Sequence, residues 1–193
     1  MRIFVAGASG VIGVRLLARL VEAGHVVAGM TRTASKVALL RGLGAKPVVA
    51  DVFDAEALRG AILDFAPDVI IHELTDLPDD ARLIPEHAAA NARIRREGTQ
   101  NLLAAARVAA VGRVLAQSVA WELSGDGGAA TRDLERFVLD AGGVILRYGR
   151  LYGPGTYHER DLPERPRVHV EEAAQRTVEA LDAPTGIVTV VEA

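Results

Sequence analysis

Short apolar runs alternate with amphipathic stretches along nearly the whole chain. The runs that predict strands lie at residues 2–6, 25–30, 46–50, 68–72, 113–117, 143–148 and 186–192. The stretches with the period of an amphipathic helix lie at residues 11–23, 35–43, 55–65, 86–109, 131–141 and 171–181. Strands and helices in strict alternation predict an α/β fold, a doubly wound parallel sheet with helices on both faces.

The apolar pattern inside two of these strands supports a sheet that is covered on both faces. Val69-Ile70-Ile71 and Val144-Ile145-Leu146 are apolar at every position, as strands buried on both sides should be. Gly24 and Gly44 follow predicted helices, where a C-cap residue is expected. Asp54 precedes the helix at residues 55–65, in the N-cap position.

Two polar stretches that contain proline, residues 75–85 and 149–167, carry neither period and are predicted to be loops. The second is long, and loops of that length are uncommon unless they are functional or flexible. No linker divides the 193 residues, so we expect a single domain, with residues 149–193 contributing a short substrate-binding portion.

Composition narrows the class of protein. Half of the residues are hydrophobic but only 4% are aromatic, so the core must consist mainly of Val, Leu, Ile and Ala. A net charge of -3 gives no electrostatic basis for a nucleic-acid partner. The absence of cysteine fits a cytoplasmic protein, and no apolar run approaches the roughly 18 residues of a membrane span. The five histidines lack the spacing of a ligand pair, so no metal site is predicted.

The clearest chemical signal lies in the first thirteen residues. An apolar strand ends in Gly7-x-x-Gly10-x-x-Gly13, and a helix follows at once. Gly7 permits a tight turn, Gly10 lets phosphates approach the backbone, and Gly13 lets the helix pack closely on the strand. The unpaired N–H groups at the start of the helix would face a pyrophosphate. We therefore predict a dinucleotide-binding turn; the alternative is a glycine turn with a purely structural role.

The end of the second predicted strand indicates which dinucleotide binds. In a doubly wound sheet this position, Thr31-Arg32, faces the adenosine ribose. An acidic residue here would accept from the 2′-hydroxyl of NAD, whereas the planar cation of Arg32 suits a 2′-phosphate. Lys36 lies one helical turn further on. NADP is predicted in preference to NAD; the alternative is a solvated surface arginine.

Two further positions at strand ends are open to more than one interpretation. Asp51, followed by Val52, is placed to accept from an adenine amino group or to cap a helix. His72 ends the fourth strand at the edge where ligands bind such sheets, as a general base or as a structural histidine.

A basic cluster, Arg93, Arg95 and Arg96, lies on the long predicted helix. Its simplest interpretation is a solvated or ion-paired helix face. An amphipathic helix of this length also suits a dimer face, so a homodimer remains an open expectation.

Taken in order, these motifs resemble the short-chain dehydrogenase/reductase superfamily, and more narrowly its extended and atypical branch, the NAD(P)-dependent epimerase/dehydratase-like proteins. The segments that carry the resemblance cover nearly the whole chain: Gly7-x-x-Gly10-x-x-Gly13, Asp51-Val52, residues 68–72, Asn91 ahead of residues 98–106, Ser118, residues 146–155 and residues 168–174. The resemblance implies a Rossmann-type sheet, a bound NAD(P), and a small carbonyl, hydroxyl or sugar-type substrate.

The resemblance also implies roles for single residues. The cofactor-binding set would comprise Gly7, Ser9, Gly10, Val11, Ile12, Gly13, Thr31, Arg32, Asp51, Val52, Leu74 and Thr75. Leu74 and Thr75 would lie by the ribose on the nicotinamide side. Ser118 matches the serine that hydrogen-bonds the reacting oxygen, and Tyr152, in a Tyr-Gly-Pro-Gly loop, would lie near the nicotinamide and the substrate.

One departure from the family concerns catalysis. The family's general acid/base is a tyrosine four residues before a lysine, which holds the nicotinamide ribose and lowers the tyrosine's pKa. No Tyr-x-x-x-Lys occurs here, because the only lysines are Lys36 and Lys46. Glu135 matches a glutamate that often follows the family's lysine by four. Counting back from it places Thr131 at the lysine's position and Gly127 at the tyrosine's.

Three functions therefore stay open. The first is an NADP-dependent oxidoreductase or epimerase/dehydratase-like enzyme, in which Ser118 polarises the substrate and Tyr152 or His72 supplies the proton. The second is a catalytically degenerate NADP-binding regulatory protein, which the missing pair favours. The third is a non-redox lyase or cyclase on the same scaffold. We favour the first, although loss of a positioned acid costs roughly 10²–10⁴-fold in rate unless another group replaces it.

Overall fold

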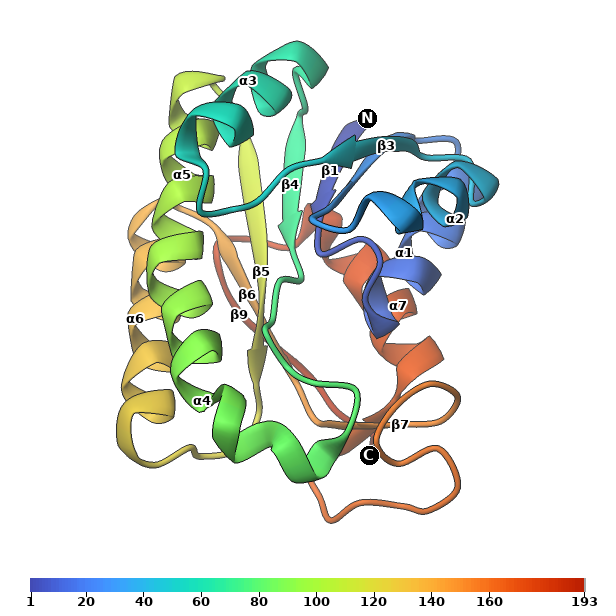
Figure 1. Ribbon diagram of the computed structural model, residues 1–193, viewed down its shortest axis with the longest axis vertical. Helices are drawn as coiled ribbons and strands as arrows, with labels where there is room; N and C mark the ends of the chain where they lie inside the picture. The colour runs from blue at the N-terminus through green and yellow to red at the C-terminus, as the bar shows by residue number, and fades with distance from the viewer. Residues whose placement is uncertain (193) are drawn as a thin grey trace.

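Seven parallel strands form the central sheet, in the order β3-β2-β1-β4-β5-β6-β9 (Figure 1). The computed structural model describes residues 1–192. The strands are β1 (Arg2–Ala6), β2 (Val26–Thr31), β3 (Lys46–Val49), β4 (Val69–His72), β5 (Arg113–Val119), β6 (Val144–Tyr148) and β9 (Gly186–Val190). The predicted doubly wound α/β fold is confirmed. The strand order reverses between β1 and β4, and the crevice at such a switch point is where ligands bind these sheets.

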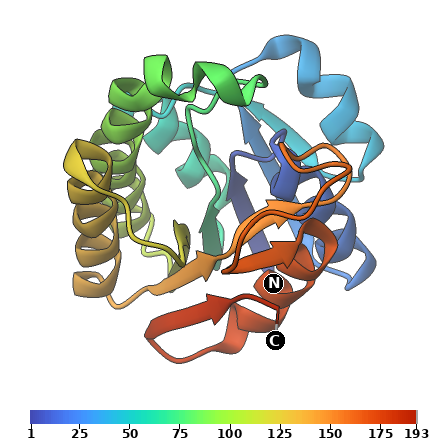
Figure 2. The same ribbon diagram turned by 90° about the horizontal axis from the view of Figure 1, so that it is seen from below.

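Helices cover both faces of the sheet. They are α1 (Val11–Glu22), α2 (Val37–Gly42), α3 (Ala55–Phe65), α4 (Ile84–Arg93), α5 (Thr99–Val108), α6 (Gly125–Asp140) and α7 (Val170–Glu179), with short 3₁₀ turns η1 (Ala34–Lys36), η2 (Ala81–Leu83) and η4 (Ala180–Asp182). Helices α1, α2 and α7 lie on one side, and α3 to α6 lie on the other (Figures 1 and 2). No helix within residues 1–192 has both the length and the apolar character that crossing a membrane requires.

The apolar core consists of two layers, one on each side of the sheet. Ile3 and Val5 belong to the layer beneath α1, whereas Phe4 belongs to the layer beneath α3 and α5. Successive side chains of a strand point to opposite faces. A strand buried on both sides is therefore apolar at every position, which is why β1, β4 and β6 lack an alternating pattern.

The long helix predicted at residues 86–109 is interrupted. A π-helical turn, η3 (Ile94–Gly98), joins α4 to α5 and turns Arg95 into the interior, where it is 5% exposed. A π-turn inserts a residue without breaking the helix, so the apolar period on either side gives little sign of it.

Helix α6 begins at Gly125, earlier than the predicted start at Thr131, so the second half of the expected connection is helical. Glycines disfavour a helix here, but tertiary contacts override that preference. Arg96 pairs with Asp126 at 2.7 Å and with Asp133 at 2.8 Å, which ties the first turns of α6 to η3.

The loop predicted at residues 149–167 also holds unpredicted structure. Its two ends pair as short parallel strands, β7 (Arg150–Tyr152) and β8 (Arg167–His169). Three residues are too few to show a period, and their partners lie far apart in the sequence. Pairing brings the ends of the loop together below the carboxyl ends of the main strands (Figure 1).

Candidate functional site

The glycine turn between β1 and α1 is closed by backbone contacts. Gly7 has a φ of +90°, and a Cβ on it would lie 2.7 Å from the backbone of Glu73. A Cβ on Gly13 would lie 2.4 Å from the Gly7 carbonyl oxygen. A Cβ on Gly10 would have only that same oxygen within 4 Å, at 3.3 Å. Gly7 and Gly13 are therefore needed for the fold, whereas Gly10 leaves open the side on which a ligand can approach.

Helix α1 begins without a side-chain cap. Its N-cap is Gly10, and its first turn holds no acidic residue. Val14 is the first residue to donate to the Gly10 carbonyl, at 3.1 Å, so the N–H groups of Val11, Ile12 and Gly13 precede the first intrahelical bond. The positive end of the helix dipole and these N–H groups together suit a diphosphate.

The end of β2 is joined to this turn. Ser9 Oγ lies 3.0 Å from Thr31 Oγ1, which also accepts from the Thr33 N–H. Arg32 is half exposed and donates from Nη2 to Asp76 Oδ1 at 2.7 Å. This bond to Asp76 raises the pKa of Arg32. Sequence reasoning missed Asp76, because it lies in the loop after β4 and only the fold brings it to β2.

Asp51 and Val52 contribute first to local structure. Asp51 accepts from the Phe53 N–H at 2.9 Å, which closes a turn. Val52 is buried, and its carbonyl accepts from Asn101. Asp54 caps α3, as predicted. A role for Asp51 and Val52 around an adenine stays a prediction.

Leu74 and Thr75 follow β4 directly beside the glycine turn. A Cβ on Gly7 would lie 3.0 Å from the Leu74 nitrogen. Leu74 is half buried and Thr75 is exposed. Leu74 is therefore placed beside the turn, with Thr75 next to it in the chain; contact of these two residues with a dinucleotide stays a prediction.

His72 is enclosed by protein. It is 1% exposed, its Nε2 lies 3.0 Å from Thr99 Oγ1, and its Nδ1 accepts from the Leu74 N–H. Burial, helped by the nearby charge of Arg95, lowers its pKa to about 4. A neutral imidazole with both nitrogens engaged fits the structural alternative better than a general base.

Ser118 is also buried, and its hydrogen is committed. It donates to Glu135 Oε1 at 2.6 Å, and Arg147 binds both oxygens of the same carboxylate at 2.8 and 2.6 Å. Burial opposes ionisation of Glu135, but the bonds from Arg147 and Ser118 outweigh it and lower the pKa of Glu135. Ser118 must exchange this bond before it can donate to a substrate.

A buried polar chain lies on the opposite face of the sheet. The Tyr148 hydroxyl lies 2.9 Å from Glu73 Oε1 and 2.6 Å from Thr177 Oγ1, and Thr177 donates to the Ala173 carbonyl. These three hydrogen bonds need three hydrogens, and the hydroxyls of Tyr148 and Thr177 supply only two. A proton on the Glu73 carboxyl would supply the third. Burial raises the pKa of Glu73 to about 8, which agrees with this count. Glu73 was not singled out in the sequence, since nothing local reveals its burial.

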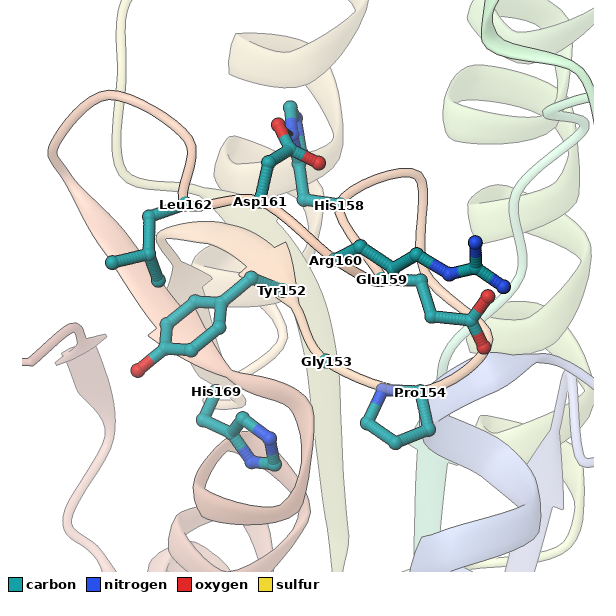
Figure 3. Close-up of a pocket in the computed structure, with 9 residues that line it drawn as sticks. All are labelled: Tyr152, Gly153, Pro154, His158, Glu159, Arg160, Asp161, Leu162 and His169. Atoms are coloured by element: carbon teal, nitrogen blue, oxygen red, sulfur yellow. Dashed lines mark hydrogen bonds and ion pairs between the residues drawn. The ribbon is translucent and has the colours of Figure 1, made fainter.

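Tyr152 lines a cavity of about 350 Å³ formed by the loop between β7 and β8 (Figure 3). Its hydroxyl donates to Glu192 at 2.9 Å and points away from Pro154 (Figure 3). The bond to Glu192 raises the pKa of Tyr152. The same loop contacts the first turns of α1, because Arg15 donates to the Pro154 carbonyl at 2.6 Å.

The three predicted catalytic residues do not form one constellation. Within residues 1–192, no hydrogen bond joins Ser118, Tyr152 or His72 to another of the three, and no cluster of three or more His, Asp or Glu residues could hold a metal. The predicted cofactor residues, by contrast, lie at or after the carboxyl ends of the neighbouring strands β1, β2, β3 and β4.

A sequence profile of the NAD dependent epimerase/dehydratase family matches residues 3–137. The chain belongs to this family. The Rossmann-type sheet and the glycine turn are thus those of an NAD(P)-dependent epimerase/dehydratase-like protein, as the resemblance in the sequence implied.

Two relatives of the chain are named as reductases. The 3-diazoavenalumate denitrifying reductase of a Streptomyces species is 40% identical over 188 residues, covering 83% of this chain and 60% of the relative. A ketoreductase of Stigmatella aurantiaca, named for a farnesylated dihydroquinoline oxide, is 31% identical over 118 residues, covering 60% of this chain and 32% of that protein. The chain therefore spans less than two thirds of either relative.

Solved structures share the fold. The UDP-glucose 4-epimerase of Thermus thermophilus, solved in complex with NAD, matches with a TM-score of 0.82 at 20% identity. The match covers 99% of this chain and 78% of the epimerase. At this identity the likeness establishes the arrangement of the epimerase/dehydratase scaffold.

Proposed function

We propose that this protein is an NADP-dependent oxidoreductase that exchanges a hydride with a small carbonyl, hydroxyl or sugar-type substrate. The main support for the proposal is the start of α1, where no side chain caps the helix and the space around Gly10 leaves room for a diphosphate. The 40% identity to a reductase agrees with it. Epimerisation or dehydration through transient oxidation would use the same hydride step. A purely regulatory binder, or a lyase without redox chemistry, has less support because both named relatives are reductases.

Different residues of the chain would bind the cofactor and the substrate. The nicotinamide cofactor, when bound, would supply the hydride as NADPH or accept it as NADP⁺. The N–H groups of Val11 and Ile12 would bind its diphosphate, and Arg32 would bind its 2′-phosphate. The hydroxyl of Ser118 donates to the Glu135 carboxylate, and the hydroxyl of Tyr152 donates to the Glu192 carboxylate. In the proposed reaction each hydroxyl would donate to the substrate oxygen instead.

The direct test is titration with NADPH and NADH, followed by a substrate panel monitored by nicotinamide absorbance. The panel combines aldehydes, ketones and sugar nucleotides with an arenediazonium salt, because one relative is named for a diazo substrate. We expect NADPH to bind and at least one substrate to be reduced. Binding without turnover would favour a regulatory role, and no binding of either nucleotide would refute the proposal.

Cofactor preference gives a second test. Arg32→Ala should weaken NADPH binding roughly 10–100-fold, the worth of charged hydrogen bonds, and hardly change NADH binding. Asp76→Asn should strengthen NADPH binding, because it removes a carboxylate that occupies the Arg32 guanidinium at 2.7 Å. Calorimetry at low and high salt measures both. Equal changes for NADPH and NADH in Arg32→Ala would show that the arginine is merely a surface residue.

Of the three tyrosines, Tyr152 is the one that lines the cavity formed by the loop between β7 and β8. Tyr148 is buried with its hydroxyl engaged, and Tyr157 donates to the Pro78 carbonyl. We expect Tyr152→Phe to lower kcat by roughly 10²–10⁴-fold while leaving the Kd for NADPH unchanged, because it removes the proposed acid alone. Tyr157→Phe is the matched control and should keep kcat. An unchanged kcat in Tyr152→Phe would remove this residue from the mechanism.

A further inference from the structure

Arg95 is a buried cation without an ion-pair partner. The residue is 5% exposed, and the one hydrogen bond that its side chain makes within residues 1–192 joins Nη1 to Thr131 Oγ1. Within residues 1–192, no Asp or Glu lies at ion-pair distance from it. Glu135 is the carboxylate whose charge is felt at Arg95, but Arg147 already binds both of its oxygens.

The inward position of Arg95 results from the π-turn. Its two neighbours in the basic cluster remain outside, where Arg93 pairs with Glu97 and Arg96 pairs with Asp126 and Asp133. The sequence prediction of an ion-paired surface holds for these two and is wrong for Arg95. Single π-turns inside α-helices occur frequently at functional sites, because they re-aim one side chain at a cost to the helix.

Arg95 lies where β4 and β5 end. Its charge lowers the pKa of His72, the last residue of β4, and its partner Thr131 lies one turn before Glu135 on α6. Glu135 in turn holds Ser118 of β5. This group contains two cations, one carboxylate and a neutral imidazole, so it carries one net positive charge. A buried charge without compensation is unfavourable, and an acceptor from a ligand would relieve it.

We propose that Arg95 binds the nicotinamide half of the cofactor, by donating to the hydroxyl oxygens of the ribose beside the nicotinamide. The proposal rests on the proposed NADP binding. Arg32 lies after β2, on one side of β1, and Arg95 lies near the ends of β4 and β5, on the other side. A dinucleotide lying across the glycine turn would therefore have one half near each arginine. A guanidinium has five donors in a planar fork, of which Thr131 uses one, and a vicinal diol supplies paired acceptors.

This assignment also gives a physical account of the missing lysine. Counting from Glu135 placed Thr131 at the lysine's position, and Thr131 has no charge. The structure brings a positive charge to Thr131 from a different helix, through a residue about 36 positions away in the sequence. Arg95 is a positioning residue in this scheme, since a guanidinium keeps its proton at neutral pH and does not act as an acid.

The test separates the two halves of the cofactor. Kd values for NADPH and for adenosine 2′,5′-bisphosphate, which lacks the nicotinamide half, are measured by calorimetry for the wild type, Arg95→Met and Arg95→Lys. We expect Arg95→Met to weaken NADPH roughly 10–100-fold and to leave the bisphosphate unchanged, with partial recovery in Arg95→Lys. Arg93→Met, which removes an exposed arginine of the same cluster, is the control and should change neither Kd.

Melting temperatures verify that each variant folds. If Arg95→Met does not fold, Arg95→Gln, which keeps a donor without the charge, replaces it under the same criterion. An unchanged Kd for NADPH would overturn the proposal, and so would an equal loss for both ligands, since that result indicates a structural role. If the wild type binds the bisphosphate but Arg95→Met binds NADPH normally, only the Arg95 assignment fails. If the wild type binds neither ligand, the proposed function itself fails.

Discussion

Replacing Glu73 with Gln is expected to raise the melting temperature at pH 8, by a margin that shrinks as the pH falls toward 5. The buried carboxyl keeps its proton in the folded chain up to a pKa of about 8, whereas its ordinary value is 4.5. Between these values the unfolded chain has released the proton and the folded chain has not. The free energy of unfolding therefore decreases as the pH rises, with a limiting slope of about 1.4 kcal/mol per pH unit from this group.

Glutamine lacks that titration and preserves the local hydrogen bonds. Its amide offers the Tyr148 hydroxyl both a donor and an acceptor, as a protonated carboxyl does, so the chain to Thr177 stays intact. The measurement is thermal unfolding of the wild type and Glu73→Gln from pH 5 to pH 9. Glu179→Gln, which neutralises an exposed carboxylate on α7, is the control. Wild type and Glu73→Gln curves that run parallel across this range would show that Glu73 is ionised in the folded chain.

Gly13→Ala is expected to destabilise the chain by about 3 kcal/mol, at the upper end of the usual cost of overpacking. The added Cβ would lie 2.4 Å from the Gly7 carbonyl oxygen and 2.7 Å from the Ala8 backbone, so β1 and α1 would have to move apart. Backbone atoms in a closed turn cannot shift as a flexible side chain can. Urea unfolding measures the loss.

Gly10→Ala is the matched variant in the same turn. Its Cβ would meet one oxygen, at 3.3 Å instead of 2.4 Å, so the loss of stability should be much smaller than in Gly13→Ala, while the new methyl group would occupy the side from which phosphates approach. NADPH binding should therefore fall strongly in a chain that still folds. A Gly10→Ala variant with normal NADPH affinity would contradict the placement of the diphosphate.

Local features of this protein were predictable because their causes are local. The β4 and β6 runs are apolar at every position, and Asp54 caps α3 as its place before the helix indicated. Gly24 and Gly44 have φ values of +82° and +81° just after α1 and α2, where a side chain would be strained. The glycine spacing after β1 likewise indicated the turn, and the family profile confirms the scaffold that it belongs to.

The chemical environment of the predicted residues was not predictable in the same way. Arg32 was interpreted as a ligand of a 2′-phosphate or as a solvated surface arginine, and the fold pairs it with Asp76 from another loop. His72 was open to two interpretations, a general base or a structural histidine, and burial beside Arg95, which lowers its pKa, favours the second. Ser118 was identified as a donor, and the structure shows its hydrogen on Glu135.

The sequence by itself determined the doubly wound sheet, the dinucleotide turn and the absence of a Tyr-x-x-x-Lys pair, since periodicity, caps and spacing are properties of neighbouring residues. Only the tertiary structure decided that Arg95 faces inward and that the Glu73 carboxyl lies against Tyr148. Both depend on burial and on partners from distant segments. Burial and distant partners determine whether a group is charged and which hydrogen bonds it can still make. Neither can be predicted from the residues next to it in the sequence.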